Sequence, residues 1–544
     1  MDKNKITAKK SAVGMFFSGV VILTVANILV KSVGLISKIV LNTVVGSEGA
    51  GYYSSAYEIY AFLYVISTSG LPIAISILIS KCRAKGKLKE AKKILNVSLL
   101  MFLIIGGILA SCMLAFSNEI AEIISAPKTS VCIMAVAPTI LFVSLSSCLR
   151  GYFQGYQLMR PTGVSQFIEA LSKVIIGVGF AFYAKSMGYD DFTVAAYTIL
   201  GVTIGVFLGM VYLFMRRLFL KEKALYTENP PLESEKPAET SKIVKSLAYI
   251  AIPITISSAV LSLTTIIDTF MIQGRLLESG LNEELVRIYY GDYTTLVISM
   301  INLPTILIYP IANALVPLIS SAIANKREEQ SANMRALSLR VINLISIPCA
   351  LGLGLFSKPI LDLLMFTSDS VERASPWLSV GAVSVVFLGI IAATNAFLNT
   401  AGKQMLPIIS MLFGALVKLL SNYFLLDKIG IFGAPLGTVM CYFCAACLNV
   451  FFVVKYVGKL PNLRKAFGIP LVCALISVGG AALIYLLLSH IITTKISTIV
   501  CIILAIISYL FLILKTKAVT KDELLMLPKG KKIARFLSKL RILP

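Results

Sequence analysis

Apolar stretches of about 20 residues recur along the whole sequence, and each is long enough to cross a hydrocarbon layer of ~30 Å as a helix. Of the 544 residues, 57% are hydrophobic and only 14% are charged, against roughly 25% charged residues in an average soluble protein. The core of a soluble protein does not require so many hydrophobic and so few charged residues. The sequence therefore predicts an all-α, polytopic membrane protein.

The apolar runs between charged residues or Pro and Gly breaks predict about fourteen transmembrane helices. The predicted spans are 12–45, 52–80, 94–117, 131–149, 161–184, 193–215, 247–272, 292–324, 338–356, 377–397, 407–426, 435–454, 469–489 and 496–514. The basic start of the chain precedes an apolar run that continues to Val45. That run is too long for a cleaved signal peptide, so we interpret it as the first spanning helix.

The distribution of charge predicts the orientation in the membrane. An even number of spans puts both termini on one side, and most of the 50 Lys and Arg residues fall on that side. Basic residues crowd the loop at 81–93, whereas Asp190 and Asp191 mark a loop on the opposite side. The positive-inside rule then predicts that both termini are cytoplasmic. Topology thus explains the formal charge of +23, and no basic soluble module indicates a nucleic-acid partner.

An internal repeat is visible in two segments, 153–173 and 398–418. Each has a polar cytoplasmic turn, a Met-x-Pro sequence that starts at Met159 or Met405, and an apolar helix with one mid-span lysine. Duplication of a six-helix unit explains the match, and an even number of spans per unit makes the two copies parallel. Chance similarity between hydrophobic helices is the alternative explanation.

The repeat predicts two pseudo-symmetric six-helix lobes. The predicted parts are an N-terminal lobe at 1–220, a cytoplasmic linker at 221–246, a C-terminal lobe at 247–456, transmembrane helices 13 and 14 at 457–515, and a basic amphipathic tail at 516–544. Within the tail, apolar and basic residues alternate with helical spacing over 529–544, which predicts a surface helix on the inner leaflet. A solvated tail is the alternative.

Ionisable residues inside the predicted spans are functional candidates, because each costs ~2.5–3.5 kcal/mol at the bilayer centre on insertion scales and should face protein or water. They are Lys31, Lys38, Glu58, Glu169, Lys173, Asp268 and Lys418. Lysines outnumber acids in this set, which favours an anionic substrate over a cationic drug. Arg150 and Arg160 flank a cytoplasmic turn, where an anionic headgroup would enter or where topology alone would place arginine.

Several pairings of these charges stay open. Glu169 and Lys173 are four residues apart on one helix, so they can neutralise each other. Lys418 has no partner one turn away on its own helix, and it needs an acid on another span, a wet cavity or an anionic ligand. Asp268 is either that acid, a cation site or an end residue that reaches the interface. Since Lys173 and Lys418 are equivalent in the two copies, we expect both to face one central cavity together with Lys31.

The segment RGYFQGYQLMRP at 150–161 resembles the loop between the fourth and fifth helices of the stage V sporulation protein B and YtgP-type polysaccharide transport family. NTAGK at 399–403 is similar to the counterpart of this loop in the second lobe. The resemblance implies the multidrug/oligosaccharidyl-lipid/polysaccharide exporter fold. It also implies a lipid II or related undecaprenyl-pyrophosphate saccharide as cargo, in peptidoglycan, spore cortex or polysaccharide biosynthesis.

MurJ-like lipid II flippases carry an Arg-x-x-Gly-x-x-Arg pattern in the first helix. The nearest match here is Lys31-x-x-Gly34, with the second cation at Lys38 instead of position 37. Because lysine replaces arginine and the spacing differs, the resemblance implies only a cationic role. The implied partners are a lipid-linked anionic saccharide, the membrane lipids and, as candidates, cell-wall synthesis proteins.

Three other functions compete with a flippase. A cation-coupled drug antiporter on the same fold should carry acids in the first span, which has two lysines instead. A glycosyltransferase or polymerase needs acid/base or metal-binding groups near one membrane face, but the one histidine, His490, lies beside an outer loop. An ATP-driven pump needs a phosphate-binding Gly-x-x-x-x-Gly-Lys-[Ser/Thr] sequence, which does not occur.

A flippase breaks no covalent bond, so no catalytic residue, cofactor or metal is expected. Cys441, Cys444 and Cys447 cluster on one apolar helix without a His or carboxylate partner, and we interpret them as packing residues. The membrane potential can supply the energy for outward movement of an anionic lipid, at ~2.3 kcal/mol per charge per 100 mV.

Overall fold

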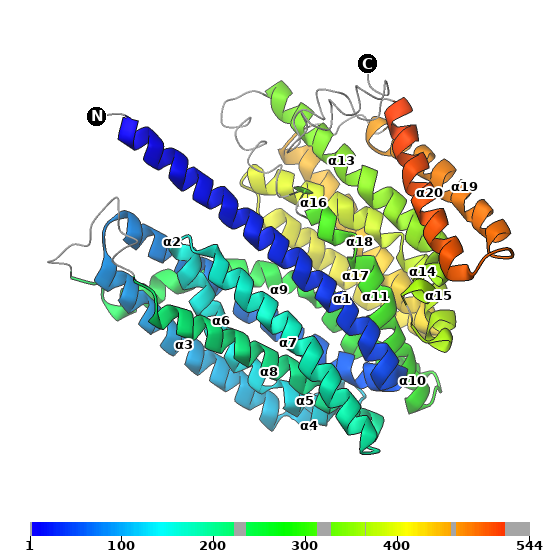
Figure 1. Ribbon diagram of the computed structural model, residues 1–544, viewed down its shortest axis with the longest axis horizontal. Helices are drawn as coiled ribbons and strands as arrows, with labels where there is room; N and C mark the ends of the chain where they lie inside the picture. The colour runs from blue at the N-terminus through cyan, green and yellow to red at the C-terminus, as the bar shows by residue number, and fades with distance from the viewer. Residues whose placement is uncertain are drawn as a thin grey trace. The chain divides into compact units, whose positions relative to one another are not determined.

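The structure is a computed structural model that describes residues 3–221, 236–309, 311–312, 328–364, 366–458 and 464–516. Within these ranges every regular element is a helix, which confirms the predicted all-α class (Figure 1). The chain divides into two compact units, Met1–Gly291 and Asp292–Pro544. This division falls after the predicted linker, because helix α9 (Thr240–Glu278) packs against helices α1, α2 and α3. The lobe boundaries derived from the repeat stay a prediction.

Unit 1 contains ten α-helices and one short 3-10 helix in its described part. They are α1 (Lys3–Thr68), α2 (Gly70–Ala84), α3 (Leu88–Ala115), α4 (Ser117–Ile123), η1 (Pro127–Thr129), α5 (Ser130–Val136), α6 (Pro138–Gly155), α7 (Met159–Ser186), α8 (Asp191–Leu218), α9 and α10 (Glu283–Asp292), whose last residue opens unit 2. Helix α1 is two helical segments joined at Gly46, where φ is 83°. This left-handed conformation suits glycine, and it separates the first two predicted spans.

The helix pair α7 and α8 forms one side of unit 1, and the two helices run side by side in Figure 1. A Cβ atom added at Gly201 of α8 would lie 2.4 Å from the Gly177 backbone of α7. One turn further along α8, a Cβ at Gly205 would lie 2.8 Å from the carbonyl oxygen of Glu169. Small residues therefore let α8 approach the backbone of α7, as is common between membrane helices, and this contact fixes the part of α7 that carries Glu169 and Lys173.

Unit 2 is also helical throughout its described part. Its elements are the π-helix η3 (Tyr293–Val297), α11 (Ile298–Asn302), α13 (Glu328–Leu355), α14 (Ser357–Leu363), α15 (Ser368–Gly381), α16 (Ser384–Thr400), α17 (Met405–Ile429), η4 (Gly430–Phe432), α18 (Gly433–Tyr456), the π-helix η5 (Arg464–Gly468), α19 (Ile469–Leu488) and α20 (Thr494–Lys515). Helices α19 and α20, drawn in orange and red in Figure 1, pack against each other. They correspond to the last two predicted spans.

The helix pair α17 and α18 repeats the local plan of α7 and α8. Helices α7 and α17 both begin at the Met of their Met-x-Pro sequence, at Met159 and Met405. A Cβ added at Gly414 of α17 would lie 2.7 Å from the carbonyl oxygen of Cys441 on α18. The Cys441 side chain is buried at this contact, in agreement with a packing role.

Long apolar helices make this a multi-pass membrane protein. Eleven candidate spans, or twelve if the bent pair α15 and α16 is one span, occur among the described residues by length and composition. One of these candidates, Met405–Tyr456, contains both α17 and α18 and so covers two predicted spans. Large apolar side chains such as Ile503, Ile507 and Leu510 are exposed on α20, as lipid-facing residues should be. The count of fourteen and the cytoplasmic termini stay predictions.

Glycine and proline residues inside the predicted spans can be compared with the helix bounds where the structure describes them. The second predicted span contains a break in front of Gly70-Leu71-Pro72, because α1 ends at Thr68 and α2 begins at Gly70. Helix α9 continues through Pro253. Pro310 and Pro317, most of the linker and the predicted surface helix at 529–544 lie outside the described residues.

Candidate functional site

A cavity of about 290 Å³ lies within unit 1 among helices α1, α7 and α8. The apolar part of its wall consists of small or aliphatic residues, namely Val30, Gly34, Ala61, Ala170, Val174 and Val202. The polar part of the wall consists of Ser37, Tyr57, Tyr60, Tyr64, Gln166, Glu169 and Lys173. Two of the sequence candidates, Glu169 and Lys173, therefore face one cavity. A mainly apolar wall with a few converging polar groups is typical of a ligand site.

A row of four tyrosines on α1 forms one wall of this region. Tyr53, Tyr57, Tyr60 and Tyr64 follow helical spacing, so their side chains share one face of the helix. Their neighbouring ring centroids are 5.7, 5.7 and 5.8 Å apart along the row, within the usual range for aromatic pairs. The candidates predicted from the sequence did not include this row, because they were chosen by charge. The spacing Tyr-x-x-x-Tyr-x-x-Tyr-x-x-x-Tyr was the available signal.

Glu169 forms its ion pair with Arg150 and not with Lys173. The Nη2 atom of Arg150 on α6 donates to Oε2 of Glu169 at 2.7 Å, and its Nε donates to the Ser165 hydroxyl at 3.1 Å. The arginine side chain is only 6% exposed. Arg150 therefore lies inside unit 1 as the counter-ion of Glu169, whereas Arg160, at the start of α7, is exposed. The two arginines that the sequence placed together have different surroundings.

Lys173 contacts tyrosines. Its Nζ atom lies 4.1 Å from the centroid of the Tyr57 ring, a cation–π contact. Tyr53, one turn before Tyr57, also interacts electrostatically with the ammonium. Since the charge of Glu169 is matched by Arg150, the positive charge of Lys173 is held by aromatic groups that carry no formal charge.

The other candidates of unit 1 lie on α1 and α9. Lys38, one residue beyond the wall residue Ser37, interacts electrostatically with Glu58 and Lys173. Lys31 lies on α1, and its side chain is outside the described set. Asp268 on α9 is 4% exposed and interacts electrostatically with Tyr290. Neither Asp268 nor Lys38 is part of the cavity wall.

Lys418 is enclosed within unit 2. Its side chain on α17 is 1% exposed, and Asn422, one turn further along, is fully buried. A Cβ added at Gly437 of α18 would lie 2.4 Å from the side-chain oxygen of Asn422, so α18 packs closely on this part of α17. The expectation that Lys418 shares a central cavity with Lys31 and Lys173 stays a prediction.

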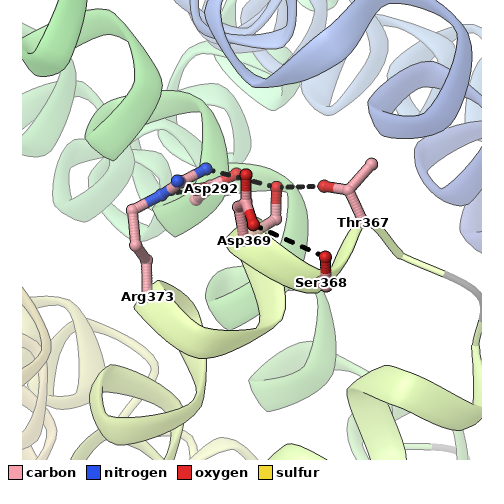
Figure 2. A network of polar contacts seen from close by, with 6 residues as sticks. Asp292, Thr367, Ser368, Asp369 and Arg373 are labelled. Atoms are coloured by element: carbon pink, nitrogen blue, oxygen red, sulfur yellow. Dashed lines mark hydrogen bonds and ion pairs between the residues drawn. The ribbon is translucent and has the colours of Figure 1, made fainter.

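A second charged cluster in unit 2 joins α15 to the end of α10 (Figure 2). Arg373 Nε donates to Asp292 Oδ2 at 2.8 Å, and the Asp292 side chain is 0% exposed. The Thr367 hydroxyl donates to Ser370 at 2.7 Å in the first turn of α15. The sequence candidates did not include this pair, because Asp292 stands at the edge of a predicted span and Arg373 lies in a predicted loop.

Comparison with solved structures identifies the class of fold. The chain is similar to a lipid II flippase MurJ in an inward closed conformation, with a TM-score of 0.68 and 17% identity over 90% of this chain and 98% of the other. It is also similar to an inward-facing multidrug resistance MATE family transporter of the MOP superfamily, with a TM-score of 0.64 and 14% identity over 78% and 93% of the two chains. The fold is that of this transporter superfamily.

The chain belongs to the polysaccharide biosynthesis protein family, which matches residues 16–323. The MatE family also matches residues 294–424. Two similar relatives come from Bacillus subtilis (strain 168). Stage V sporulation protein B is 26% identical over 85% of this chain and 88% of its own length. Lipid II flippase MurJ is 24% identical over 81% and 82%. The family resemblance seen in the sequence is thus confirmed.

Proposed function

We propose that this protein is a flippase that moves an undecaprenyl-pyrophosphate-linked saccharide, lipid II or a related polysaccharide precursor, from the inner to the outer leaflet by alternating access. The observation that carries the proposal is the cavity of unit 1, in which Glu169 is paired with Arg150 while the Lys173 ammonium contacts the Tyr57 ring. Such a wall has an unmatched positive charge. An anionic headgroup is the ligand that it favours.

The charges around the cavity support this assignment. Among the described side chains around the cavity, Arg150, Lys173 and Lys38 are cations and Glu169 and Glu58 are acids, so one positive charge is in excess among these five. At ~4 Å and an effective dielectric of ~20, one lysine–phosphate charge pair gains ~4 kcal/mol before desolvation. That gain is comparable to the ~2.5–3.5 kcal/mol needed to place a lysine at mid-membrane. A bound diphosphate would offset the cost of the buried lysine.

The names of the relatives support the same function. Lipid II flippase MurJ and stage V sporulation protein B each match most of this chain. The same fold also occurs in a multidrug resistance MATE family transporter, so the fold alone does not choose between the two cargoes. The excess of one positive charge among the described residues around the cavity favours the anionic lipid over a cationic drug. A flippase needs no bond-breaking residues, so we assign no catalytic role to any side chain.

A reconstituted assay tests the proposal. Purified protein is placed in vesicles that carry a fluorescent undecaprenyl-pyrophosphate saccharide, and the fraction that a membrane-impermeant quencher reaches is followed in time. We expect wild-type protein to speed translocation and Lys173→Gln to slow it at least tenfold, because an ion pair of ~4 kcal/mol before desolvation is lost. Lys173→Arg keeps the charge and should retain part of the rate.

The control variant is Lys428→Gln, which removes an exposed positive charge near the end of α17 and should transport at the wild-type rate. Labelled product formed from the lipid precursor would favour an enzyme instead. Translocation of a cationic drug but not of the saccharide lipid would favour the antiporter. A wild-type rate from Lys173→Gln would remove the role proposed for this lysine.

A further inference from the structure

The Lys173 side chain covers an aromatic face that belongs to the cavity wall. Its ammonium lies 4.1 Å from the centre of the Tyr57 ring, and Tyr57 lines the cavity together with Tyr60 and Tyr64. The planar amide of Gln166 lies on the opposite helix, α7, in the same wall. The cavity therefore combines three phenol rings, one amide, one paired carboxylate and one lysine.

This combination suits the two parts of a glycosylated diphosphate. A sugar ring has an apolar face of C–H groups, which packs on an aromatic face, and a rim of hydroxyls, which bonds to phenol and amide groups. Tyrosine serves both needs, because it pairs an apolar ring with a polar hydroxyl. The diphosphate needs a cation. Lys173 supplies one from the same wall.

We propose, on the basis of the proposed function, that the Tyr57 ring is a sugar-stacking position that Lys173 covers in this structure and that the diphosphate of the same ligand uncovers. A direct ammonium–phosphate ion pair is stronger than a cation–π contact at similar separation. The lysine therefore moves from the ring to the phosphate, and the exposed ring receives the sugar. Charge recognition and sugar recognition are coupled through one side chain.

The coupling has a thermodynamic consequence. Binding of the diphosphate makes the sugar position available, so the two parts of the ligand help each other, and this help is reciprocal. A neutral lipid-linked sugar has to displace Lys173 without compensation and should bind more weakly. A sugar-free diphosphate lipid binds through Lys173 and leaves the ring unused.

Binding measurements on the full chain in detergent test the inference with two probes, undecaprenyl pyrophosphate and an undecaprenyl-pyrophosphate disaccharide. We expect wild-type protein to bind the disaccharide form about tenfold more tightly, which is 1.4 kcal/mol. Tyr57→Leu should lose this preference and bind the sugar-free lipid at least as tightly as wild-type protein, because Lys173 no longer has to leave a ring. Tyr57→Phe keeps the ring and should keep the preference, while Lys173→Gln should weaken both probes.

The matched control is Tyr189→Leu, because Tyr189 stacks on Tyr197 with centroids 5.8 Å apart but lies outside the cavity wall. It should keep the wild-type preference. The inference is overturned if Tyr57→Leu retains the tenfold preference, or if it weakens both probes equally. If wild-type protein binds neither probe, the proposed function itself fails. If it binds both probes equally, only the sugar-stacking role fails.

A second measurement needs no loss of the ring. The chain has one tryptophan, Trp377 on α15, so the double variant Trp377→Phe, Tyr57→Trp carries a single indole at the proposed position. Its emission should change when the disaccharide lipid binds, since Lys173 leaves the ring and a sugar replaces it. Unchanged emission at saturating disaccharide lipid would contradict the movement of Lys173.

Discussion

Lys173 on α7 and Lys418 on α17 occupy equivalent places in two similar segments, but they have different surroundings. Lys173 is half-buried, lines a cavity and contacts the Tyr57 ring. Lys418 is 1% exposed. The two helices begin at equivalent methionines and each packs through glycine against the next helix. Equivalent lysines in a duplicated segment thus need not have equivalent roles, because the neighbouring side chains decide whether a charge meets a cavity or the protein interior.

The difference lies in what faces each lysine. In unit 1 the neighbouring helix α1 presents a row of large tyrosines, and a cavity of about 290 Å³ is found between these rings and α7. In unit 2 the buried Asn422 and the close approach of Gly437 bring α17 and α18 together beside Lys418. A buried charge is removed from water and depends on its protein contacts, so a substitution there changes the free energy of unfolding more than one at an exposed charge.

The largest effect is expected at the Arg150–Glu169 pair, which is buried and borders the cavity. Arg150→Gln leaves the Glu169 charge without its counter-ion, so we expect the free energy of unfolding to fall by about 3–5 kcal/mol. The released carboxylate is then free to pair with Lys173, which should also reduce transport. Thermal unfolding in detergent and the vesicle assay measure the two effects.

The double variant Arg150→Gln, Glu169→Gln removes both charges and should recover most of the stability, because no unpaired buried charge remains. It should recover transport as well, since Lys173 keeps its free charge. Equal stability of the single and double variants would show that the pair has no coupling, and that the cavity is not shaped by it.

The next effect compares the two lysines directly. We expect Lys418→Gln to lower the free energy of unfolding by about 3 kcal/mol, because removal of a buried charge leaves the groups that contacted it unsatisfied. Lys173→Gln should cost about 1 kcal/mol, because it loses mainly a cation–π contact. Unfolding temperatures of the two variants measure the difference, and equal losses would break the comparison.

The transport rate of Lys418 variants separates a role in substrate binding from a purely structural one. If this lysine also meets the substrate, as the repeat predicts, Lys418→Gln should lose transport at temperatures where its fold is intact, and Lys418→Arg should retain part of it. Transport that falls only as far as the folded fraction falls would assign Lys418 a structural role.

The sequence predicted much of this fold for physical reasons that act locally. Long apolar runs required helices, and the predicted spans that begin at Pro161 and Pro407 correspond to α7 and α17, which start two residues earlier at Met159 and Met405. The pairing of charges was not readable, because Arg150 and Glu169 meet across two helices. Helical spacing on α7 suggested Glu169 with Lys173, but the counter-ion came from α6. The tyrosine row was readable and was overlooked.

A smaller effect is expected from the glycines that bring each helix pair together. Gly201→Ala places a Cβ 2.4 Å from the Gly177 backbone, and Gly414→Ala places one 2.7 Å from the Cys441 carbonyl oxygen. Overpacking of this kind costs about 1–3 kcal/mol, and we expect the first variant to lose more because its Cβ comes closer to the neighbouring backbone. Gly201→Ala should also reduce transport, since α8 holds α7 beside the cavity.

The matched control for both glycine variants is Gly179→Ala on α7, where an added Cβ meets nothing within 4 Å. It should be neutral or slightly stabilising, because alanine favours helix more than glycine does. Unfolding temperatures of the three variants give the order. Equal destabilisation by Gly179→Ala would attribute the effect to glycine itself and not to close packing.

The smallest effect is expected at the exposed ion pair of unit 2, Lys358 with Glu372, whose atoms are 3.2 Å apart and whose side chains are 56% and 71% exposed. Exposed pairs contribute about 0–1 kcal/mol, because water and salt screen them. Lys358→Gln should therefore change the unfolding temperature very little, and less at high salt.

The ion pair of Arg373 with Asp292 in the same unit provides the contrast, since the Asp292 side chain is 0% exposed. Arg373→Gln removes an ion pair of a fully buried carboxylate and should destabilise the protein clearly more than Lys358→Gln, at low and high salt alike. If both variants lower the unfolding temperature equally and high salt reduces both effects, burial does not determine how much a charge contributes to stability in this protein. The distinction between Lys173 and Lys418 would then lose its physical basis.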